Sequence, residues 1–386
     1  MDVELEGISP IDRQHVLILG GSNFMGKDLV VRLVSMPDDI RPVVYVINRA
    51  KSHWNKEIES FSHKYHFYYG DRDSHIEYTK LLKYLTVKAG RLTGVRESFK
   101  WDLVVDFCGY LRKEVKSAIR GLSGSIRLYV FISSDSVYDV SETSGLSTPV
   151  REEESVRPSC NKEIMEKAEA EDYGHDKFKC EEYLKNHASE VKVAFPYLCL
   201  RLPDVIGPYD STGRFWAYLL WLRKMEDWPI HTKKESSTKP LSFVFSQDVV
   251  RLTISFLTKV HDPEFINKVH TQSYNIAFIE NPTLDMLVQD LSDCICTGPV
   301  NFISRAGLDN LSDTRGKSKN KGKFFFPSVY CPHLDTTKAK IDLGFRPSTL
   351  KDAVLITCNF FENAAIYEEE FKKAVGKLAK VGEMYK

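Results

Sequence analysis

A tyrosine, a lysine and a serine are the residues whose types and spacing most clearly suggest catalysis. Tyr173 and Lys177 stand one helical turn apart in "YGHDKF", so in a helix they lie on the same face. A lysine ammonium beside a phenol favours the phenolate and lowers the phenol pKa from about 10 toward neutral pH. Ser134 ends a predicted strand and can orient a reacting oxygen. These three residues predict general acid–base chemistry with Tyr173 as the proton donor or acceptor.

A glycine-rich turn near the start of the chain predicts a dinucleotide site. The stretch "HVLILGGSNFMGKDLV" is typical of a strand, a tight turn and a helix whose N-terminus binds a pyrophosphate. Asn23 stands where a G-x-x-G-x-x-G turn has its middle glycine, and we expect it to adopt a positive φ. Such turns are common, so the motif is weak alone. The cofactor-binding residues predicted here are Gly20, Gly21, Asn23, Phe24, Met25 and Gly26.

Polar or small residues follow three other predicted strands. Asn48 and Arg49 follow "VVYVI", where an acid would hold the ribose 2′-hydroxyl of NAD. An arginine suits a 2′-phosphate, so we expect NADP as the cofactor, with NAD as the alternative. The alternative without a binding role is an Arg49 side chain that simply faces solvent. In "GDRD", Asp71 can accept from the adenine amino group, with Arg72 beside it. In "DFCG", small residues let a cofactor lie against the backbone; this segment supplies Phe107, Cys108 and Gly109.

Short apolar runs alternate with helical patterns through the first half of the chain. The runs at 16–19, 43–47, 65–69, 103–107, 128–132 and 197–202 are apolar at both parities, which predicts strands buried on both faces. Helical patterns at 26–36, 76–88 and 113–122 separate several of them. The expected fold is α/β, with a doubly wound, Rossmann-type parallel sheet and right-handed crossovers.

The pattern changes after about residue 203, and 386 residues are enough for two domains. We expect a dinucleotide-binding domain over 1–203, with an insertion at about 140–172, and a smaller α/β substrate domain over 204–386, partly interleaved with the first. The isolated strands "SFVF" and "SYNIAF" are assigned to the second domain. The basic segment 315–323 is interpreted as a solvated loop, with anion binding as the alternative.

Composition excludes several classes of protein. Lys plus Arg and Asp plus Glu both number 53, so the net charge is zero and bulk attraction to nucleic acid or an anionic membrane is not indicated. The N-terminal segment is acidic and polar, unlike a targeting peptide, and no run of about 18 apolar residues occurs. The eight cysteines lack zinc-site spacing. We expect reduced thiols, no metal site and a cytoplasmic protein.

Six segments together resemble one family, the extended short-chain dehydrogenases/reductases of the NAD-dependent epimerase/dehydratase type. They run from about residue 14 to 362 and are "GGSNFMG", "GDRD", "ISSDSVY", "YGHDK", "LRLPDVIGP" and "DTTKAKIDLGFRP". The turn resembles that of atypical members with a GGxxFxG pattern. The resemblance implies catalysis by Tyr173, Lys177 and Ser134, with Tyr173 and Lys177 also touching the cofactor. It further implies a cofactor contact at Pro203 and a homodimer.

Departures from the family pattern bear on the substrate. The T-D-E of sugar-nucleotide dehydratases is Ser134-Asp135-Ser136 here, which removes the glutamate needed for that dehydration. Leu241 stands where epimerases place an arginine on the UDP diphosphate, "FFFPS" replaces a second arginine segment, and Asp204 replaces an asparagine. A smaller or less anionic substrate is therefore expected. The predicted substrate residues are Asp135, Ser136, Asp204, Phe215 and Trp216, although the last two belong to an aromatic stripe that also suits core packing.

The leading interpretation is an NAD(P)-dependent oxidoreductase, exchanging hydride with a carbonyl/alcohol small molecule other than a UDP-sugar. A sugar or sugar-nucleotide epimerase is the alternative on the same residues, and net NADPH turnover separates the two. A non-catalytic nucleotide- or RNA-binding protein is the alternative from another class. Salt-dependent RNA binding would favour it.

Overall fold

The computed structural model describes residues 13–49, 61–95, 99–142, 147–190, 195–210, 240–295 and 333–364, with shorter pieces between 212 and 232 and at 302–304. Its main sheet has the strand order β10-β6-β5-β4-β1-β2-β3, and every pair is parallel. The strands are β1 (His15–Leu19), β2 (Val43–Asn48), β3 (His66–Tyr69), β4 (Trp101–Asp106), β5 (Ile126–Ser134), β6 (Tyr197–Leu202) and β10 (Gln272–Asn275). The order reverses beside β1, as in a doubly wound fold.

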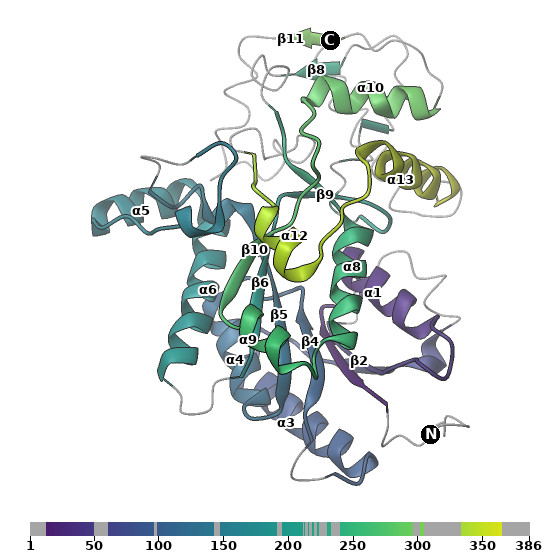
Figure 1. Ribbon diagram of the computed structural model, residues 1–386, viewed down its shortest axis with the longest axis vertical. Coiled ribbons are helices and arrows are strands. Elements are labelled where there is room, and N and C mark those ends of the chain that lie inside the picture. The colour runs from purple at the N-terminus through teal and green to yellow at the C-terminus, as the bar shows by residue number, and fades with distance from the viewer. Residues whose placement is uncertain are drawn as a thin grey trace.

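Helices cover both faces of this sheet (Figure 1). Alternate strand residues face opposite sides, because the side-chain period of a strand is two. Ile18 and Val105 pack in the core that includes residues of α1, α8, α9 and α12, whereas Leu17 and Val104 pack in the core that includes residues of α3, α4 and α6. The helices are α1 (Phe24–Val34), α3 (His75–Leu92), α4 (Arg112–Leu122), α6 (Asp172–Glu190), α8 (Ser246–Ser255), α9 (Pro263–Val269) and α12 (Thr337–Leu343).

A second hydrophobic core lies beyond the carboxyl edge of the sheet, in the upper part of Figure 1. It joins residues of α10 (Leu284–Ile295) and α13 (Leu350–Ala364) to a small parallel sheet of β7 (Asp204–Ile206) and β9 (Phe243–Phe245). Another short parallel pair is formed by β8 (Ile230–Thr232) and β11 (Phe302–Ser304). The domain boundary at residues 203 and 204 stays a prediction.

Two sequence-based expectations about strands are wrong. The segment "SYNIAF" contributes β10, which pairs with β6 at the edge of the main sheet instead of belonging to the second domain. The third strand is not buried on both faces, since Phe67 and Tyr69 are 45% and 63% exposed. β3 is the strand at the opposite edge of the sheet. Its aromatic residues give it the composition of a buried strand, although these two side chains are exposed.

The predicted insertion contains two short elements beside the β10 edge. These are the 3₁₀ turn η3 (Glu152–Glu154) and helix α5 (Asn161–Ala170), which projects at the left of Figure 1. Glu152 is buried and accepts a hydrogen bond of 2.7 Å from the backbone N–H of Asn275. None of the α5 residues is buried, which agrees with the polar composition of this segment.

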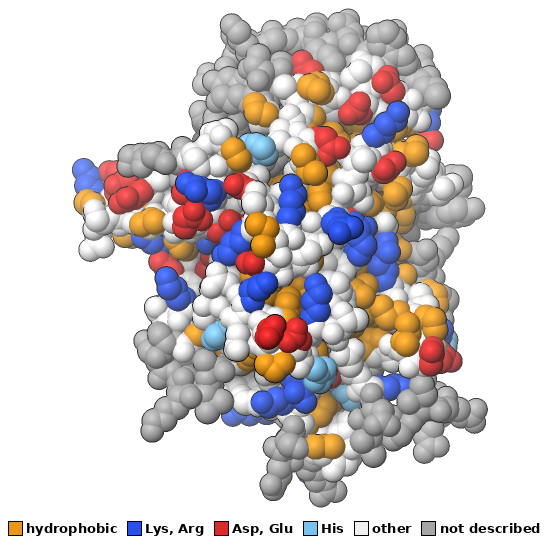
Figure 2. Space-filling model, viewed as in Figure 1, with side chains coloured by type: hydrophobic (Ala, Val, Ile, Leu, Met, Phe, Trp, Pro, Cys, Tyr) orange, Lys and Arg blue, Asp and Glu red, His pale blue; other side chains and the backbone are white. Residues whose placement is uncertain are grey.

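The surface and the thiols add little chemistry of their own. On the face in Figure 2, basic side chains are scattered and acidic ones lie among them, most visibly over α5 and α6. Six described cysteines are free thiols, while Cys296 and Cys331 lie outside the described residues, as does the basic segment 315–323. No helix in the described part of the chain is long and apolar enough to cross a membrane.

Candidate active site

Two cavities lie at the carboxyl ends of the strands and share part of their walls. The glycine-turn cavity has a volume of 460 Å³ and the tyrosine cavity a volume of 480 Å³. Their common lining means that one extended ligand can reach from one cavity into the other. The residues that line both are Phe24, Met25, Phe107, Tyr110 and Thr212.

The glycine turn is held by close backbone approaches. Gly20 has φ +94°, and its N–H donates to the carbonyl of Ile47 at 3.0 Å. A Cβ on Gly26 would lie 2.2 Å from the carbonyl oxygen of Gly20, so only glycine allows α1 to begin so near the turn. Gly21 does not line the cavity, and a Cβ there would meet Val46 at 2.7 Å; its predicted cofactor contact stays a prediction. The first turn of α1 has no acidic residue, and the N-terminus of a helix suits an anionic group.

The positive φ expected at Asn23 is absent. Asn23 is extended, with φ −136° and ψ 153°, and immediately precedes α1. Phe24 takes the left-handed conformation instead, with φ 45°. The chain therefore makes its sharp change of direction one residue later than the glycine pattern predicts, at a residue whose side chain lines both cavities.

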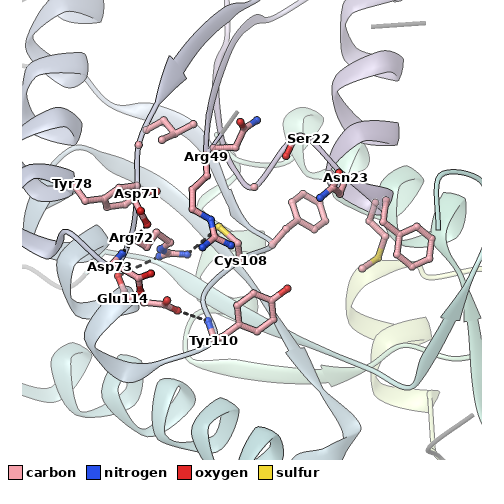
Figure 3. A pocket seen from close by; sticks show the side chains of 18 of the residues that line it. Ser22, Asn23, Arg49, Asp71, Arg72, Asp73, Tyr78, Cys108, Tyr110 and Glu114 are labelled. Carbon is pink, nitrogen blue, oxygen red and sulfur yellow. Dashed lines mark hydrogen bonds between the residues drawn. The ribbon is translucent and has the colours of Figure 1, made fainter. Parts of the chain in front are cut away.

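Residues from the ends of β2 and β3 line the other side of the glycine-turn cavity. Asn48 is the last residue of β2 and Arg49 follows it, and Figure 3 shows the Arg49 side chain extending into the cavity. Asp71 also lines the cavity, and its carboxylate accepts from the N–H of Asp73 at 3.1 Å. Arg49 can thus meet a ligand here, as the sequence predicts, but its side chain is also exposed to solvent, so its role stays a prediction.

Arg72 forms a buried ion pair below this cavity. Its guanidinium donates to the two carboxylate oxygens of Asp106 at 2.6 and 2.8 Å and to the carbonyl of Glu114 at 3.2 Å. A further contact of 3.3 Å reaches the sulfur of Cys108. Burial alone would raise the pKa of Asp106, but the ion pair outweighs it and the pKa falls below its ordinary value. Arg72 lines the cavity mainly as a supporting residue, and its predicted cofactor contact stays a prediction.

Lys177 and Tyr173 line the tyrosine cavity from α6. The buried Lys177 ammonium donates to the carbonyls of Gly109 at 2.9 Å and Ile132 at 2.8 Å, and lies 5.9 Å from the Tyr173 ring centroid. Tyr173 is 41% exposed, so its phenol can reach a ligand in the cavity. Gly109 lines neither cavity; its carbonyl anchors Lys177, which corrects its expected place against the cofactor.

Ser134 lies at the end of β5 and lines the tyrosine cavity. Its hydroxyl donates to Asp135 and accepts from the N–H of Ser136, both at 3.2 Å. The three residues predicted from "SSDS", Ser134, Asp135 and Ser136, therefore all line this cavity. The preceding Ser133 donates to Glu181 at 2.6 Å, so this strand end is tied to the helix that carries Lys177.

Glu181 forms a second buried ion pair behind the tyrosine cavity. Arg201 donates to both of its carboxylate oxygens, at 3.1 and 2.7 Å. Burial alone would raise the pKa of Glu181, but the charge of Arg201 outweighs it and the pKa falls below its ordinary value. β5, β6 and α6 are joined by this network, which fixes Ser134 relative to Tyr173 and Lys177.

The predicted substrate residues divide into two groups. Asp204 and the neighbouring Pro203 line the tyrosine cavity, together with Asp135 and Ser136. Phe215 does not, because it is fully buried in the second core, so its predicted substrate contact is wrong and the core-packing alternative applies. Trp216 lies outside the described residues. Leu241, the residue in place of an epimerase arginine, is also fully buried in that core.

Several lining residues were not predicted from the sequence. Tyr110 follows "DFCG" directly and lines both cavities, so its position after a strand end was the available signal. Asp139 and Glu171 add two carboxylates to the tyrosine cavity. Nothing in their sequence surroundings distinguishes them from surface acids, since only the packing of α6 against the turn after β5 brings them to this cavity.

Comparisons with known proteins bear on the family and the fold of the chain. The sequence profile of the NAD dependent epimerase/dehydratase family matches residues 16–277, more than half of the chain. A search of curated protein sequences finds no match.

Solved structures of this fold cover nearly the whole chain. A UDP-glucose-4-epimerase from Stenotrophomonas maltophila with bound NAD is 14% identical, covering 92% of this chain and 99% of its own, with a TM-score of 0.64. A dTDP-glucose 4,6-dehydratase from Bacillus anthracis in complex with NAD is 13% identical, with coverages of 93% and 99% and a TM-score of 0.62. A UDP-glucuronic acid 4-epimerase from Bacillus cereus is 16% identical, covering 91% of this chain and 99% of its own, with a TM-score of 0.61. At these identities the likeness shows the fold alone.

Proposed function

The chain belongs to the NAD dependent epimerase/dehydratase family, and we propose that it is an NADP(H)-linked oxidoreductase acting on a carbonyl/alcohol small molecule. One observation carries this proposal above the others. Tyr173, Lys177 and Ser134 line one cavity, and that cavity adjoins the glycine-turn cavity through shared lining residues. A dinucleotide lying across both would place its nicotinamide end beside the three residues.

The residues of the glycine-turn cavity fit such a cofactor. The contact between Gly26 and Gly20 leaves room for a diphosphate at the start of α1, and Asn48, Arg49 and Asp71 line the end suited to adenosine. When bound, the nicotinamide supplies the hydride donor or acceptor of the reaction. The protein supplies the binding surface, the orientation and the proton path.

Each residue of the tyrosine cavity has a distinct proposed role. Tyr173 exchanges the proton with the substrate oxygen, because its phenol is the exposed member of the set. Lys177 is fixed by two carbonyls, and its charge stabilises negative charge that develops on the phenol oxygen. Ser134 orients the substrate oxygen, while its bond to Asp135 fixes the hydroxyl.

The preference for NADP rests on Asn48 and Arg49. An acid at the end of β2 would accept from the ribose 2′-hydroxyl and repel a 2′-phosphate, whereas Arg49 can pair with that phosphate. All three solved structures named above contain NAD, so the proposed preference distinguishes this chain from them.

The charges of the tyrosine cavity support a substrate other than a UDP-sugar. Among its described lining residues, four are carboxylates and one, Lys177, is basic. Carboxylates accept hydrogen bonds from hydroxyl or amino groups but repel a diphosphate. With Leu241 buried in the second core, the arginine that grips the diphosphate in epimerases has no counterpart at that position. The carboxylates are Asp135, Asp139, Glu171 and Asp204.

An epimerase is the second candidate, and the descriptions of the similar structures favour it. An epimerase oxidises, rotates and re-reduces its substrate, so it consumes no cofactor overall. RNA binding has less support, because basic and acidic side chains are mixed on the face in Figure 2. The homodimer and the cytoplasmic location stay predictions.

A turnover screen tests the proposal. Wild-type protein and Tyr173→Phe are incubated with NADPH and a panel of aldehydes, ketones and keto sugars, while absorbance of the reduced nicotinamide is followed. The proposal predicts net NADPH consumption with at least one class of carbonyl, lost in the variant. Interconversion of sugar isomers without net consumption would establish the epimerase instead.

A further inference from the structure

Tyr110 stands where the two cavities meet. It lines both of them, and it directly follows the "DFCG" segment at the end of β4. Its backbone N–H donates to the carboxylate of Glu114 at 2.8 Å, and the N–H of Leu111 donates to the same oxygen at 2.9 Å. Glu114 thereby fixes the chain at the point from which the Tyr110 ring extends.

One face of the Tyr110 ring is close to a positively charged side chain. The Lys177 ammonium lies 4.8 Å from its centroid, within the range of a cation–π contact. The Tyr173 ring lies 6.3 Å away at an interplanar angle of 47°. Lys177 itself is fixed by two carbonyls, so the ring has a rigid support and a defined direction.

The hydroxyl of Tyr110 is available to a ligand. The residue is 50% exposed, and within the described part of the chain its only hydrogen bond is made by its backbone. Figure 3 shows the hydroxyl end pointing away from Glu114 and Arg72, across the cavity toward the side where Asn23 and α1 lie. Partial burial raises the pKa of Tyr110 and the charge of Lys177 partly opposes that rise, so the hydroxyl stays a donor at neutral pH.

We propose that the Tyr110 hydroxyl donates a hydrogen bond to the diphosphate of the dinucleotide, from the wall opposite the N-terminus of α1. The reason is position: a dinucleotide that spans both cavities has its diphosphate between them, and Tyr110 borders that passage with an open donor. The other shared side chains are apolar apart from Thr212, whose hydroxyl is bonded to Asp210 at 2.6 Å. The assignment rests on the proposed use of a dinucleotide.

Tyr110→Phe isolates this bond, because it keeps the ring and its contact with Lys177. Dissociation constants are measured by calorimetry for NADPH, 2′-phospho-ADP-ribose and 2′-AMP; the second lacks nicotinamide and the third lacks the diphosphate. A hydrogen bond to a charged acceptor predicts that the variant weakens the first two ligands by the same factor, about tenfold or more, and leaves 2′-AMP unchanged. Tyr84→Phe, an exposed tyrosine that lines neither cavity, is the matched control.

The other outcomes separate the possible errors. Unchanged affinities in Tyr110→Phe would overturn the assignment while leaving the proposed function in place. Weaker binding of NADPH alone would overturn it as well, since the hydroxyl would then contact the nicotinamide half. If the wild-type protein bound none of the three ligands, both the assignment and the proposed function would be wrong. Thermal unfolding of each variant checks that the fold is retained.

Discussion

Close backbone approaches shape the turn at the centre of the glycine-turn cavity, whereas the residues proposed for catalysis in the tyrosine cavity are hydroxyl and charged side chains. The first depends on the approach of Gly26 to Gly20 and on strand ends that continue the sheet hydrogen bonds. The second depends on Ser134, Tyr173, Lys177 and nearby carboxylates. A backbone cradle suits a group shared by a whole family, while side chains can change with the substrate. On the proposed function, the difference explains how a family cofactor site can adjoin a reaction site that departs from the family pattern.

Removing the phenol of Tyr173 should have the largest effect. Tyr173→Phe deletes the proton path and hardly changes volume, so kcat should fall by about 10² to 10⁴-fold while cofactor affinity is kept. Lys177→Ala should lose comparable activity and also weaken cofactor binding. The residues act as one unit, so the double variant should be little worse than either single one. Rates are measured on the carbonyl compound found by the turnover screen. A near wild-type rate in Tyr173→Phe would transfer the proton role elsewhere, with Asp135 as the next candidate.

The buried ion pair below the glycine-turn cavity should dominate acid stability there. Asp106→Asn leaves Arg72 buried without its countercharge, which should cost about 3–5 kcal/mol at pH 7. The folded pKa of Asp106 is lowered, so its contribution is present above the ordinary pKa of about 4 and is lost as pH falls through the folded pKa.

Urea unfolding between pH 3 and 7 measures this effect. The wild-type unfolding free energy should fall on acidification, and the Asp106→Asn profile should be flatter. Glu77→Gln breaks only an exposed pair with Lys80 and should change stability by about 0–1 kcal/mol. Parallel profiles for wild type and Asp106→Asn would show that this pair does not govern acid stability.

Substitutions at two glycines should disturb the two cavities one at a time. A Cβ on Gly26 would lie 2.2 Å from the Gly20 carbonyl, and one on Gly174 would lie 2.2 Å from the Ser136 carbonyl. Gly26→Ala should weaken 2′-phospho-ADP-ribose by about tenfold or more, since α1 must move from the turn. Gly174→Ala should keep that affinity and lower kcat, because it shifts α6. Gly124→Ala is the control, because a Cβ there meets no atom within 4 Å and the variant shows the effect of backbone strain without a steric clash. Equal losses of ligand affinity in both variants would mean that the cavities do not behave as separate units.

Arg49 should have the smallest effect of this series. Wild-type protein should bind NADPH more tightly than NADH, and Arg49→Ala should narrow that difference by about tenfold, as expected for a lost charge-assisted contact. Nicotinamide fluorescence titration measures both constants, with the exposed Arg91→Ala as control. Equal wild-type affinities for the two cofactors would refute the NADP preference.

Local patterns predicted much of the fold and part of the site. The apolar runs located the central strands, and the four-residue spacing brought Tyr173 and Lys177 to one cavity. The backbone of the turn was harder, because asparagine tolerance of positive φ does not decide whether Asn23 or Phe24 adopts it.

Long-range packing accounts for the remaining errors. Arg72 is committed to a partner 34 residues away, and β10 joins the sheet by pairing with β6. Phe215 is buried by α10 and α13, which lie much later in the chain. No local sequence pattern around these residues predicts such contacts. The position of Tyr110 between the two cavities likewise follows from the tertiary structure and not from its local sequence.

The central claim is that one dinucleotide joins the two cavities, and a structure of the protein with NADPH tests it most directly. The account predicts the adenosine between Arg49 and Asp71, the diphosphate at the start of α1, and C4 of the nicotinamide facing the Tyr173 hydroxyl and Ser134. A nicotinamide outside the tyrosine cavity, or a dinucleotide bound away from the glycine turn, would contradict it.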